Sequence, residues 1–440
     1  MSSVEHTQSS AIETSAELAR GKIGSEQALP ISFPCRFCGT DLRHTFVDLG
    51  ISPLCESYLS VQQLHEMEAF YPLHVFVCGN CFLVQLREYV SAESIFGEYA
   101  YFSSYSESWL AHAKAYTRKM IERFALGPKS QVVELASNDG YLLQYFVLAG
   151  MPVLGIEPAA NVAAVAVQKG VPTLVKFFNR QSAEELAAQG IKADLLLGNN
   201  VLAQVPDLNS FVAGMKILLK PSGVITMEFP HLLRLMEEGQ FDTIYHEHFS
   251  YFSFLVAEKI FSSHGLTLFD VEELSTHGGS LRIYACHAED HSKCVTSEVV
   301  SLREKEESAG FSRLESYSSF AERVKETKCA LLEFLIQAYR AGKQVAGYGA
   351  PGKGNTLLNY CGIRSELLAY TVDRNPYKQS KFLPGSHIPI FPPEQIRQTK
   401  PDYVLILPWN LKEEIMQQIG YIREWGGQFV VPIPRVKVYG

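Results

Sequence analysis

The chain has 440 residues, of which 47% are hydrophobic and 20% charged, and its formal net charge is −8. This length exceeds what one hydrophobic core organises, so we expect two or three domains. The acidic balance, the lack of a long basic run and the lack of an apolar stretch as long as a membrane span argue against nucleic-acid and membrane partners. The first residues also lack the charged and apolar segments of a signal peptide, so we expect a cytoplasmic protein.

The first 95 residues are predicted to form a loose tail and a zinc-binding domain. Residues 1–30 are rich in Ser, Glu, Ala and Gln, which is typical of a tail with at most a frayed helix near 11–20. Residues 31–95 carry two Cys-x-x-Cys turns, made by Cys35 and Cys38 and by Cys78 and Cys81. Two such turns can direct four thiolates to one tetrahedral Zn²⁺, and a four-cysteine site has no open coordination position, so the metal would be structural. His74 and Cys55 are alternative ligands, and two unrelated cysteine turns are the alternative structure.

Residues 96–299 alternate between apolar strands and amphipathic helices. Strands are expected at 131–135, 153–157, 194–198 and 224–228, with helices at 159–170 and 182–190. This alternation predicts a parallel sheet with helices on both faces. Two further strands, at 266–273 and 280–286, flank Thr276-His277-Gly278-Gly279 and are expected to form an antiparallel hairpin.

Residues 300–440 are expected to form a second sheet of the same kind. A helical stretch over 301–340, interrupted near Gly310, leads into strands at 344–349, 368–373 and 403–407. The predicted fold class is therefore α/β, with two Rossmann-like domains in series after a small N-terminal zinc-binding domain. Each sheet should offer a ligand crevice at the carboxyl ends of its strands.

The turn after the first strand of this middle region is acidic. Glu134 and Asp139 flank it, Gly140 permits close backbone approach, and Asn138 stands where a helix would begin. Dinucleotide enzymes carry GxGxxG here to seat a pyrophosphate, which these carboxylates would repel. A cationic ligand suits them better, and S-adenosylmethionine carries a sulfonium, an ammonium and a ribose whose hydroxyls Glu157 could accept. An ordinary strand-turn-helix is the alternative.

The turn that opens the last domain is glycine-rich. Gly347, Gly349 and Gly352 follow a strand in GxGxxG spacing, and Asp373 ends the next strand, which is typical of NAD binding. The same stretch nearly fits a P-loop, but a glycine stands where Ser or Thr should bind Mg²⁺. Both patterns favour a loop that holds a diphosphate, with Lys353 adding positive charge.

The run Tyr245-His246-Glu247-His248 places four side chains that donate or accept protons next to one another, and hydroxyl and aromatic residues follow it up to Ser253. Histidine titrates near neutral pH and can act as a general base or acid. No strand or helix needs this composition for packing. The alternatives to a catalytic cluster are a polar loop and a zinc site.

Several motifs, taken in order, carry a family resemblance. Beside the two cysteine pairs they are Val-Glu-Leu-Ala-Ser-Asn-Asp-Gly (133–140), Asn-Val-Leu-Ala (200–203), Tyr-His-Glu-His-Phe-Ser-Tyr (245–251), Thr-His-Gly-Gly-Ser-Leu-Arg (276–282) and Gly-Tyr-Gly-Ala-Pro-Gly-Lys-Gly-Asn-Thr (347–356). With them, residues 31–440 resemble the S-adenosylmethionine-dependent C-methyltransferases that act on nucleotide-linked 4-ketosugars in deoxysugar biosynthesis. The resemblance implies a zinc domain that covers the active site (31–95), a methyltransferase domain (96–299) and a C-terminal Rossmann-like domain that helps to hold the nucleotide sugar (300–440).

The resemblance also implies roles for individual residues. His248 would be the catalytic base, with Tyr245, Glu247 and Tyr99 near the sugar. The methyl donor would contact Glu134, Ser137, Asn138, Asp139, Gly140, Glu157 and Asn199. The nucleotide sugar, which we expect to be linked to thymidine diphosphate, would contact Gln204, His246, Gly349, Lys353 and Asn355. Family members carry His where this chain has Gln204, and because Gln cannot titrate, an acid-base role is excluded at this position.

The expected reaction methylates the carbon next to a ketone. A 4-keto group acidifies the C3 proton, and a positioned base together with a donor to the enolate oxygen would complete its removal. His248 is the expected base, with His246 or Glu247 as alternatives, and Tyr99, Tyr245 or Gln204 would donate to the oxygen. The carbanion would then attack the sulfonium methyl in line, with no metal in the chemistry.

Three other functions are weighed against this one. An NAD-dependent oxidoreductase that uses residues 347–354 is the alternative enzyme class. A zinc-ribbon RNA methyltransferase is disfavoured by the acidic charge. A non-enzymatic binding protein would require the catalytic residues to be dispersed in the fold.

Overall fold

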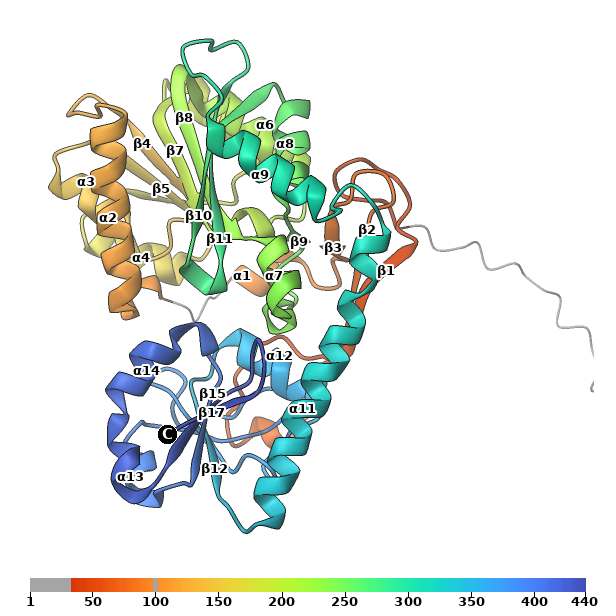
Figure 1. Cartoon of the computed structure of the whole chain (residues 1–440). Helices are drawn as coiled ribbons and strands as arrows, with labels where there is room; N and C mark the ends of the chain where they lie inside the picture. Colours follow the sequence, from red (N-terminus) through yellow and green to blue (C-terminus); the bar gives the residue numbers. More distant parts are fainter. Residues whose placement is uncertain (1–32, 98–101) are drawn as a thin grey trace, which may run out of the picture. The chain divides into compact units, whose positions relative to one another are not determined.

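The computed structural model describes residues 33–97 and 102–440. The predicted tail and Tyr99 lie outside the described residues. Within these ranges the strands form three sheets of four, seven and six strands (Figure 1). The predicted α/β class, with two Rossmann-like sheets after a cysteine-bearing N-terminal domain, is confirmed. Among the described helices, none is long and apolar enough to cross a membrane.

The N-terminal sheet has the order β1-β2-β3-β9 and is antiparallel throughout. Its strands are β1 (His44–Ser52), β2 (Tyr71–Val77), β3 (Val84–Leu86) and β9 (Ser250–Tyr251). In β2, the buried Leu73, Val75 and Val77 alternate with less buried residues, as expected for a strand with one face on a core. β9 comes from the middle of the chain, so this sheet is completed by the residues that directly follow His248.

The central sheet has the order β10-β11-β8-β7-β4-β5-β6. Its strands are β4 (Val132–Leu135), β5 (Val153–Glu157), β6 (Thr173–Val175), β7 (Ala193–Asn199), β8 (Leu219–Pro230), β10 (Leu266–Leu274) and β11 (Ser280–His287). The pairs between β6 and β8 are parallel, and β11 is antiparallel to both of its neighbours. The four predicted parallel strands and the predicted hairpin are confirmed. β8 is longer than predicted because its ends pair with Ala193 and Ser280.

Helices cover both faces of the central sheet (Figure 1). α2 (Glu107–Arg123), α3 (Leu143–Leu148) and α4 (Ala160–Gln168) lie on one face, and α6 (Leu208–Leu218) and α8 (Phe254–Ser263) on the other. α5 (Arg180–Ala188) packs beside α6. Four of these helices begin at a side chain that accepts a backbone N–H, which is how helix N-termini are normally capped: Ser106 for α2, Asn179 for α5, Asp207 for α6 and Ser253 for α8.

The C-terminal sheet has the order β14-β13-β12-β15-β16-β17. Its strands are β12 (Val345–Tyr348), β13 (Thr371–Val372), β14 (Ile390–Phe391), β15 (Tyr403–Ile406), β16 (Gln428–Val431) and β17 (Lys437–Tyr439). The predicted strand over 368–373 is only two residues long, because Leu368 still belongs to a turn that begins at Arg364. The order reverses beside β12, so the ligand crevice of such a sheet would lie near the turn that follows Tyr348.

Three helices connect the two large sheets: α9 (Ser297–Ser308), α10 (Glu315–Ser318) and α11 (Phe320–Arg340). The predicted interruption at Gly310 is confirmed, and its φ of +85° is a conformation that favours glycine. Between α9 and α11 lies the separate short helix α10, which the pattern did not predict. α11 buries Val324, Leu331 and Leu335 at helical spacing and packs against β1 and α12 (Gly352–Cys361).

Candidate active site and metal site

The four predicted metal ligands converge. Cys35 and Cys38 precede β1, and Cys78 and Cys81 form the turn between β2 and β3. Their sulfur atoms all lie within 4.8 Å of one another, with Cys35 and Cys81 3.6 Å apart and Cys38 and Cys78 3.5 Å apart. A tetrahedral Zn²⁺ with Zn–S bonds of about 2.3 Å separates its sulfurs by about 3.8 Å.

The chemistry of the cluster also fits a metal. The neighbouring sulfur of Cys78 raises the pKa of Cys35 to about 11, so four adjacent thiolates need a cation to coexist. The alternative ligands lie elsewhere. His74 Nε2 hydrogen-bonds with Thr45 Oγ1 at 2.8 Å, and Cys55 Sγ donates to Glu247 Oε1 at 3.5 Å.

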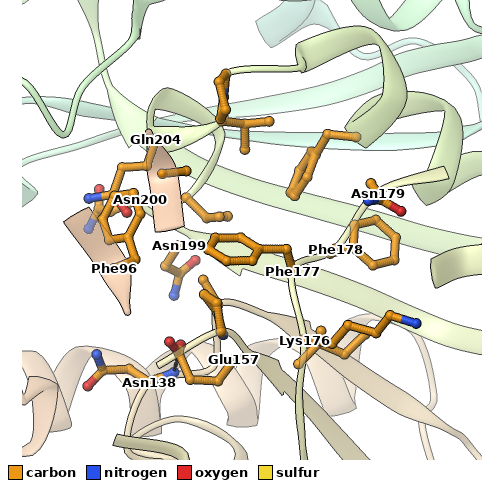
Figure 2. Close-up of a pocket in the computed structure, with 18 of the residues that line it drawn as sticks. Phe96, Asn138, Glu157, Lys176, Phe177, Phe178, Asn179, Asn199, Asn200 and Gln204 are labelled. Carbon is orange, nitrogen blue, oxygen red and sulfur yellow. Dashed lines mark hydrogen bonds between the residues drawn. The ribbon is translucent and has the colours of Figure 1, made fainter. Parts of the chain in front are cut away.

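The acidic turn after β4 forms one wall of a cavity of about 310 Å³ (Figure 2). Glu157 is 4% exposed, and its two oxygens accept the N–H groups of Asn138 and Ala159, each at 2.9 Å. These bonds fix the carboxylate at the cavity wall, and each oxygen keeps a further lone pair for a ligand hydroxyl. Burial raises the pKa of Glu157. Figure 2 shows Glu157 and Asn138 on one side, with Gln204 and Asn200 across the cavity from them.

Not all predicted donor residues line this cavity. Asn138, Glu157 and Asn199 do, together with Gln204, which was assigned to the sugar. The other four, Glu134, Ser137, Asp139 and Gly140, lie behind the wall. Glu134 is fully buried, and burial together with Glu157 and Asp139 raises its pKa well above the usual range. Asp139 forms an ion pair with Lys169 at 2.9 Å. The carboxyl groups of Glu134 and Asp139 therefore lie behind the cavity wall, where burial favours the neutral form of Glu134 and Lys169 balances the charge of Asp139.

Several residues of the cavity were missed by the sequence reasoning. Phe177 and Phe178 follow β6 (Figure 2), Trp109 comes from α2, and Ala92 and Phe96 come from α1 (Ala92–Phe96). The only sequence signal was a pair of phenylalanines after a short strand that was itself not predicted. α1 follows the N-terminal sheet in the chain, so that domain contributes a wall to this cavity.

The run after Tyr245 is buried rather than exposed. His246, Glu247 and His248 are 3%, 6% and 7% exposed. The amide of Phe249 donates to Ala203 at 2.7 Å, and the amide of Leu86 donates to Phe249 at 3.0 Å. The run is therefore held between the loop that carries Gln204 and the edge of the N-terminal sheet.

The two histidines of the run face different surroundings. His246 Nε2 lies 3.2 Å from the carbonyl of Pro72, and its ring packs against Tyr71, so it faces the N-terminal domain. His248 Nδ1 lies 2.9 Å from the carbonyl of Thr243 and must donate to it. Nε2 of His248 is then the nitrogen with a free lone pair in the neutral ring. Burial lowers the pKa of His248 to about 4, and the nearby Lys353 adds to the effect.

Lys353 lies in a small polar cluster with Asn410, Trp409 and Asp242. Its Nζ donates to Asn410 Oδ1 at 2.9 Å and lies 4.8 Å from the centre of the Trp409 ring. Burial lowers the pKa of Lys353, and Asp242 opposes this effect. Asp242 Oδ2 accepts Trp409 Nε1 at 2.7 Å, and burial raises the pKa of Asp242 to about 6. The Lys353 cation also lowers the pKa of His277, which burial brings to about 4.

The glycine-rich turn after β12 is filled by protein. A Cβ at Gly352 would lie 2.8 Å from Cys55 Sγ, and a Cβ at Gly349 would lie 2.5 Å from Pro408. Asp373, which would bind a ribose in a dinucleotide enzyme, instead accepts the amides of Ala350 at 2.7 Å and Asn375 at 2.8 Å. These contacts occupy the surface that a dinucleotide pyrophosphate would need, which argues against the oxidoreductase alternative.

A second buried network joins the cavity beside Glu157 to the β10–β11 hairpin. Glu228 Oε2 accepts a hydrogen bond from Arg282 at 2.6 Å and lies 2.9 Å from His112 Nε2. Glu228 Oε1 accepts a hydrogen bond from Thr276 Oγ1 at 2.8 Å. Although burial opposes it, His112 and Arg282 hold the pKa of Glu228 down to about 2. His277, which follows Thr276 in the chain, packs edge-on against Trp109 with ring centres 4.9 Å apart. The cavity lined by Trp109 and Glu157 therefore adjoins the cluster around Lys353.

The order of the central sheet, with one antiparallel strand inserted beside β8, and the acidic turn after β4 define a methyltransferase that uses S-adenosylmethionine. Three families match consecutive parts of the chain: "Putative zinc binding domain" at residues 35–96, "Methyltransferase domain" at 109–271 and "C-methyltransferase C-terminal domain" at 275–434. The chain is 38% identical to C-methyltransferase NovU from Streptomyces niveus over 405 residues, which cover 92% of this chain and 96% of NovU. It belongs to this family of C-methyltransferases.

Two more distant similarities cover smaller shares of the chain. The ubiquinone biosynthesis O-methyltransferase of Bartonella bacilliformis is 27% identical over 105 residues, or 23% of this chain and 42% of that protein. The crystal structure of magnesium protoporphyrin IX methyltransferase from Synechocystis PCC 6803 with bound S-adenosylmethionine is 15% identical. The similarity covers 40% of this chain and 79% of the Synechocystis chain, with a TM-score of 0.31.

Proposed function

We propose that the protein transfers a methyl group from S-adenosylmethionine to C3 of a nucleotide-linked 4-ketosugar, through an enolate, in deoxysugar biosynthesis. The observation that carries the proposal is the state of His248. Its Nδ1 proton is held by Thr243, its Nε2 keeps a lone pair, and its low pKa leaves it neutral at pH 7. A neutral, oriented imidazole is the general base that removal of a C3 proton requires.

An enolate formed beside His248 would meet a positive charge. The Lys353 ammonium lowers the pKa of both His248 and His277, so its field reaches the space around both rings. In a site of low dielectric, such a cation stabilises a developing oxyanion strongly. Tyr245 and Gln204 supply hydrogen-bond donors in the neighbouring segments, and Tyr99 stays a predicted donor.

The methyl donor would lie next to this space. Trp109 and Gln204 line the donor cavity, and Trp109 contacts His277. We propose that Glu157, which lines the cavity and is held there by two backbone amides, binds the ribose of the donor. The protein's part in the transfer is then to align the two reactants and exclude water.

Buried polar atoms without partners support a polar substrate. His277 Nδ1 and both polar atoms of the Asn355 side chain are buried and have no hydrogen-bond partner among the described residues. Such atoms are costly unless a ligand or water satisfies them. A sugar with several hydroxyls could do so, and we propose that Lys353 and Asn355 contact it. His246 faces Pro72 and is a poor candidate for this role.

For the nucleotide end of the substrate we propose a place other than the glycine turn. Because protein fills the glycine turn, we propose that its diphosphate binds in a groove of about 670 Å³ beside β12 and β13. Arg374 and Arg397 line this groove, and the Arg397 guanidinium lies 3.5 Å from the centre of the Tyr421 ring. Guanidinium groups recognise phosphate well. Thymidine diphosphate is the expected carrier.

The test is a panel of thymidine- and guanosine-diphosphate 4-ketosugars, each incubated with methyl-labelled S-adenosylmethionine. We expect label on C3 of at least one sugar, and exchange of its C3 proton with solvent deuterium when the donor is left out. Transfer of label to oxygen or nitrogen without C3 exchange contradicts the proposal. Failure of every ketosugar, in a protein that binds S-adenosylmethionine, also contradicts it.

A further inference from the structure

A chain of contacts begins beside the four-cysteine cluster and ends at residues 245–251, which we call the catalytic run. Gln85 of β3 is 1% exposed, and its Nε2 donates to Cys35 Sγ at 3.0 Å. Its Oε1 accepts the backbone N–H of Arg36 at 3.0 Å. Gln85 therefore joins a cysteine ligand to the first turn of the metal site through both ends of one side chain.

Arg36 continues this chain away from the metal. Its guanidinium donates to the carbonyl of Pro206 at 3.1 Å and to the carbonyl of Leu86, and it lies 5.4 Å from the centre of the Phe249 ring. A buried guanidinium with two backbone acceptors has little freedom to move.

The backbone provides a second connection. Gln85 pairs with Ser250 and Val84 with Tyr251 in the β3–β9 ladder, and Leu86 donates to Phe249. Phe249 in turn donates to Ala203, the neighbour of Gln204. The residue after His248 is thus fixed on one side by the N-terminal sheet and on the other by the loop that lines the donor cavity.

We propose that the metal site positions the catalytic run, and that Gln85 and Arg36 are the positioning residues that link the two. A four-cysteine metal site normally stabilises the small domain that holds it. Here the ligand Cys35 is joined through Gln85 and Arg36 to Leu86, Pro206 and Phe249. Metal binding therefore sets the backbone geometry of residues 245–251 and 203–206, in addition to holding its own turns. The catalytic meaning of this link rests on the proposed function, whereas the link itself does not.

The first experiment measures amide hydrogen exchange of the full-length protein with Zn²⁺ bound and after removal of Zn²⁺ by a chelator. We expect exchange in peptides covering 245–251 and 203–206 to rise about tenfold or more, the scale of a lost hydrogen bond to a charged group. Peptides of β4 and β5 should not change. Opening of residues 35–40 and 78–84 alone, with 245–251 still protected, overturns the proposal.

The second experiment uses variants that keep the metal, so that loss of folding in the metal-free protein cannot decide the outcome. Gln85→Glu keeps the acceptor for Arg36 but cannot donate to the Cys35 thiolate. The matched control is Thr40→Val, which removes the contact between Thr40 Oγ1 and Cys38 Sγ at 3.4 Å, on an exposed residue outside the chain of contacts.

With one Zn²⁺ retained in each variant, Gln85→Glu should raise exchange at 245–251, and Thr40→Val should leave it unchanged. Equal exchange in the two variants overturns the proposal. Because this readout needs no sugar, a failed ketosugar panel together with the expected exchange pattern would refute the proposed function and leave the link intact.

Discussion

The two large sheets each place a turn at the end of their first strand, and the two turns have opposite fates. After β4, residues 136–140 contain one glycine, yet this turn forms the wall of an open cavity. After β12, residues 349–352 contain two glycines, and Cys55 and Pro408 occupy the space beside them. Glycine in such a turn predicts that something approaches the backbone closely. In both turns the protein itself does so, since a Cβ at Gly140 would lie 3.0 Å from Val171, and it is Asn138 rather than the glycine that lines the cavity after β4.

The carboxylates that end the second strands show the same contrast. Glu157 and Asp373 both accept two backbone amides. Glu157 also lines the donor cavity, whereas Asp373 is tied to the turn of its own domain. The first sheet thus keeps its ligand crevice, and in the second sheet the equivalent surface helps to hold the N-terminal domain. The predictions below test this contrast.

The largest effect is expected at His248, which lies where the two sheets meet the N-terminal domain. If His248 is the base, His248→Asn should lower turnover by about 10²–10⁴, the usual contribution of a positioned base. Deuterium exchange at C3 without the donor should fall in parallel, and S-adenosylmethionine binding should barely change. His246→Asn is the control, because His246 faces Pro72. Normal C3 exchange in His248→Asn together with its loss in Glu247→Gln would move the base to Glu247.

His248 and Glu134 should contribute to the pH dependence of stability with opposite signs. His248 has a folded pKa of about 4, below its unfolded value of 6.5, so the unfolded chain binds more protons between these values. Its contribution is present above pH 6.5 and lost as pH falls to 4, and is worth up to about 3 kcal/mol. Glu134 has a raised folded pKa, so it makes stability fall as pH rises above its unfolded value.

Denaturant unfolding from pH 4 to 7 measures both contributions. His248→Asn should flatten the rise of the free energy of unfolding with pH, and Glu134→Gln should steepen it. If the slope of the unfolding free energy against pH changed in the same direction in both variants, the folded pKa of His248 or of Glu134 would not be shifted in the direction given above.

The donor site can be tested against its counterpart in the second sheet. Glu157→Ala should weaken S-adenosylmethionine binding by about 1.5–3 kcal/mol, the loss expected for a charged hydrogen-bond partner. Asp373→Asn should leave donor binding unchanged and lower the melting temperature. Titration calorimetry gives the first quantity and thermal unfolding the second. Tight NAD binding that depends on Asp373 would reverse the contrast between the two turns.

The smallest effect concerns the filled turn. Gly352→Ala places a Cβ against Cys55 Sγ and should destabilise the protein by about 1–3 kcal/mol, the usual cost of overpacking. Cys55→Ala in the same chain should remove much of this cost, which a double-mutant cycle of unfolding free energies would measure. Additive effects of the two substitutions would mean that Cys55 does not fill the turn.

Much of this structure follows from local sequence patterns. Period-2 and helical spacing predicted the parallel strands and the hairpin of the central sheet, because those elements are long or strongly apolar. β6 and β14 have three and two residues and carry too little pattern to recognise, and β13 was predicted but four residues too long. The cysteine spacing predicted the metal cluster, since its ligands lie in two short turns.

The sites were harder to predict because they combine distant segments. Nothing local in residues 53–56 indicates that Cys55 packs on a turn some 300 residues later, or that it donates to Glu247. Likewise, α1 and Trp109 reach the donor cavity only through the tertiary fold. The assignment of Lys353 to a diphosphate followed from a pattern that matches many loops, whereas its side chain lies beside Asn410 and Trp409.

The strand β9 has a consequence for how the chain is made. Strands β1 to β3 leave the ribosome more than 160 residues before Ser250, and until then the far edge of β3 has no partner. An unpaired strand edge invites pairing with other chains. The N-terminal region is therefore not a portable module, and a fragment that ends near residue 97 would expose the edge that residues 250–251 normally close. During synthesis, the edge of β3 therefore stays unpaired, or is shielded by another protein, until residues 250–251 have been made.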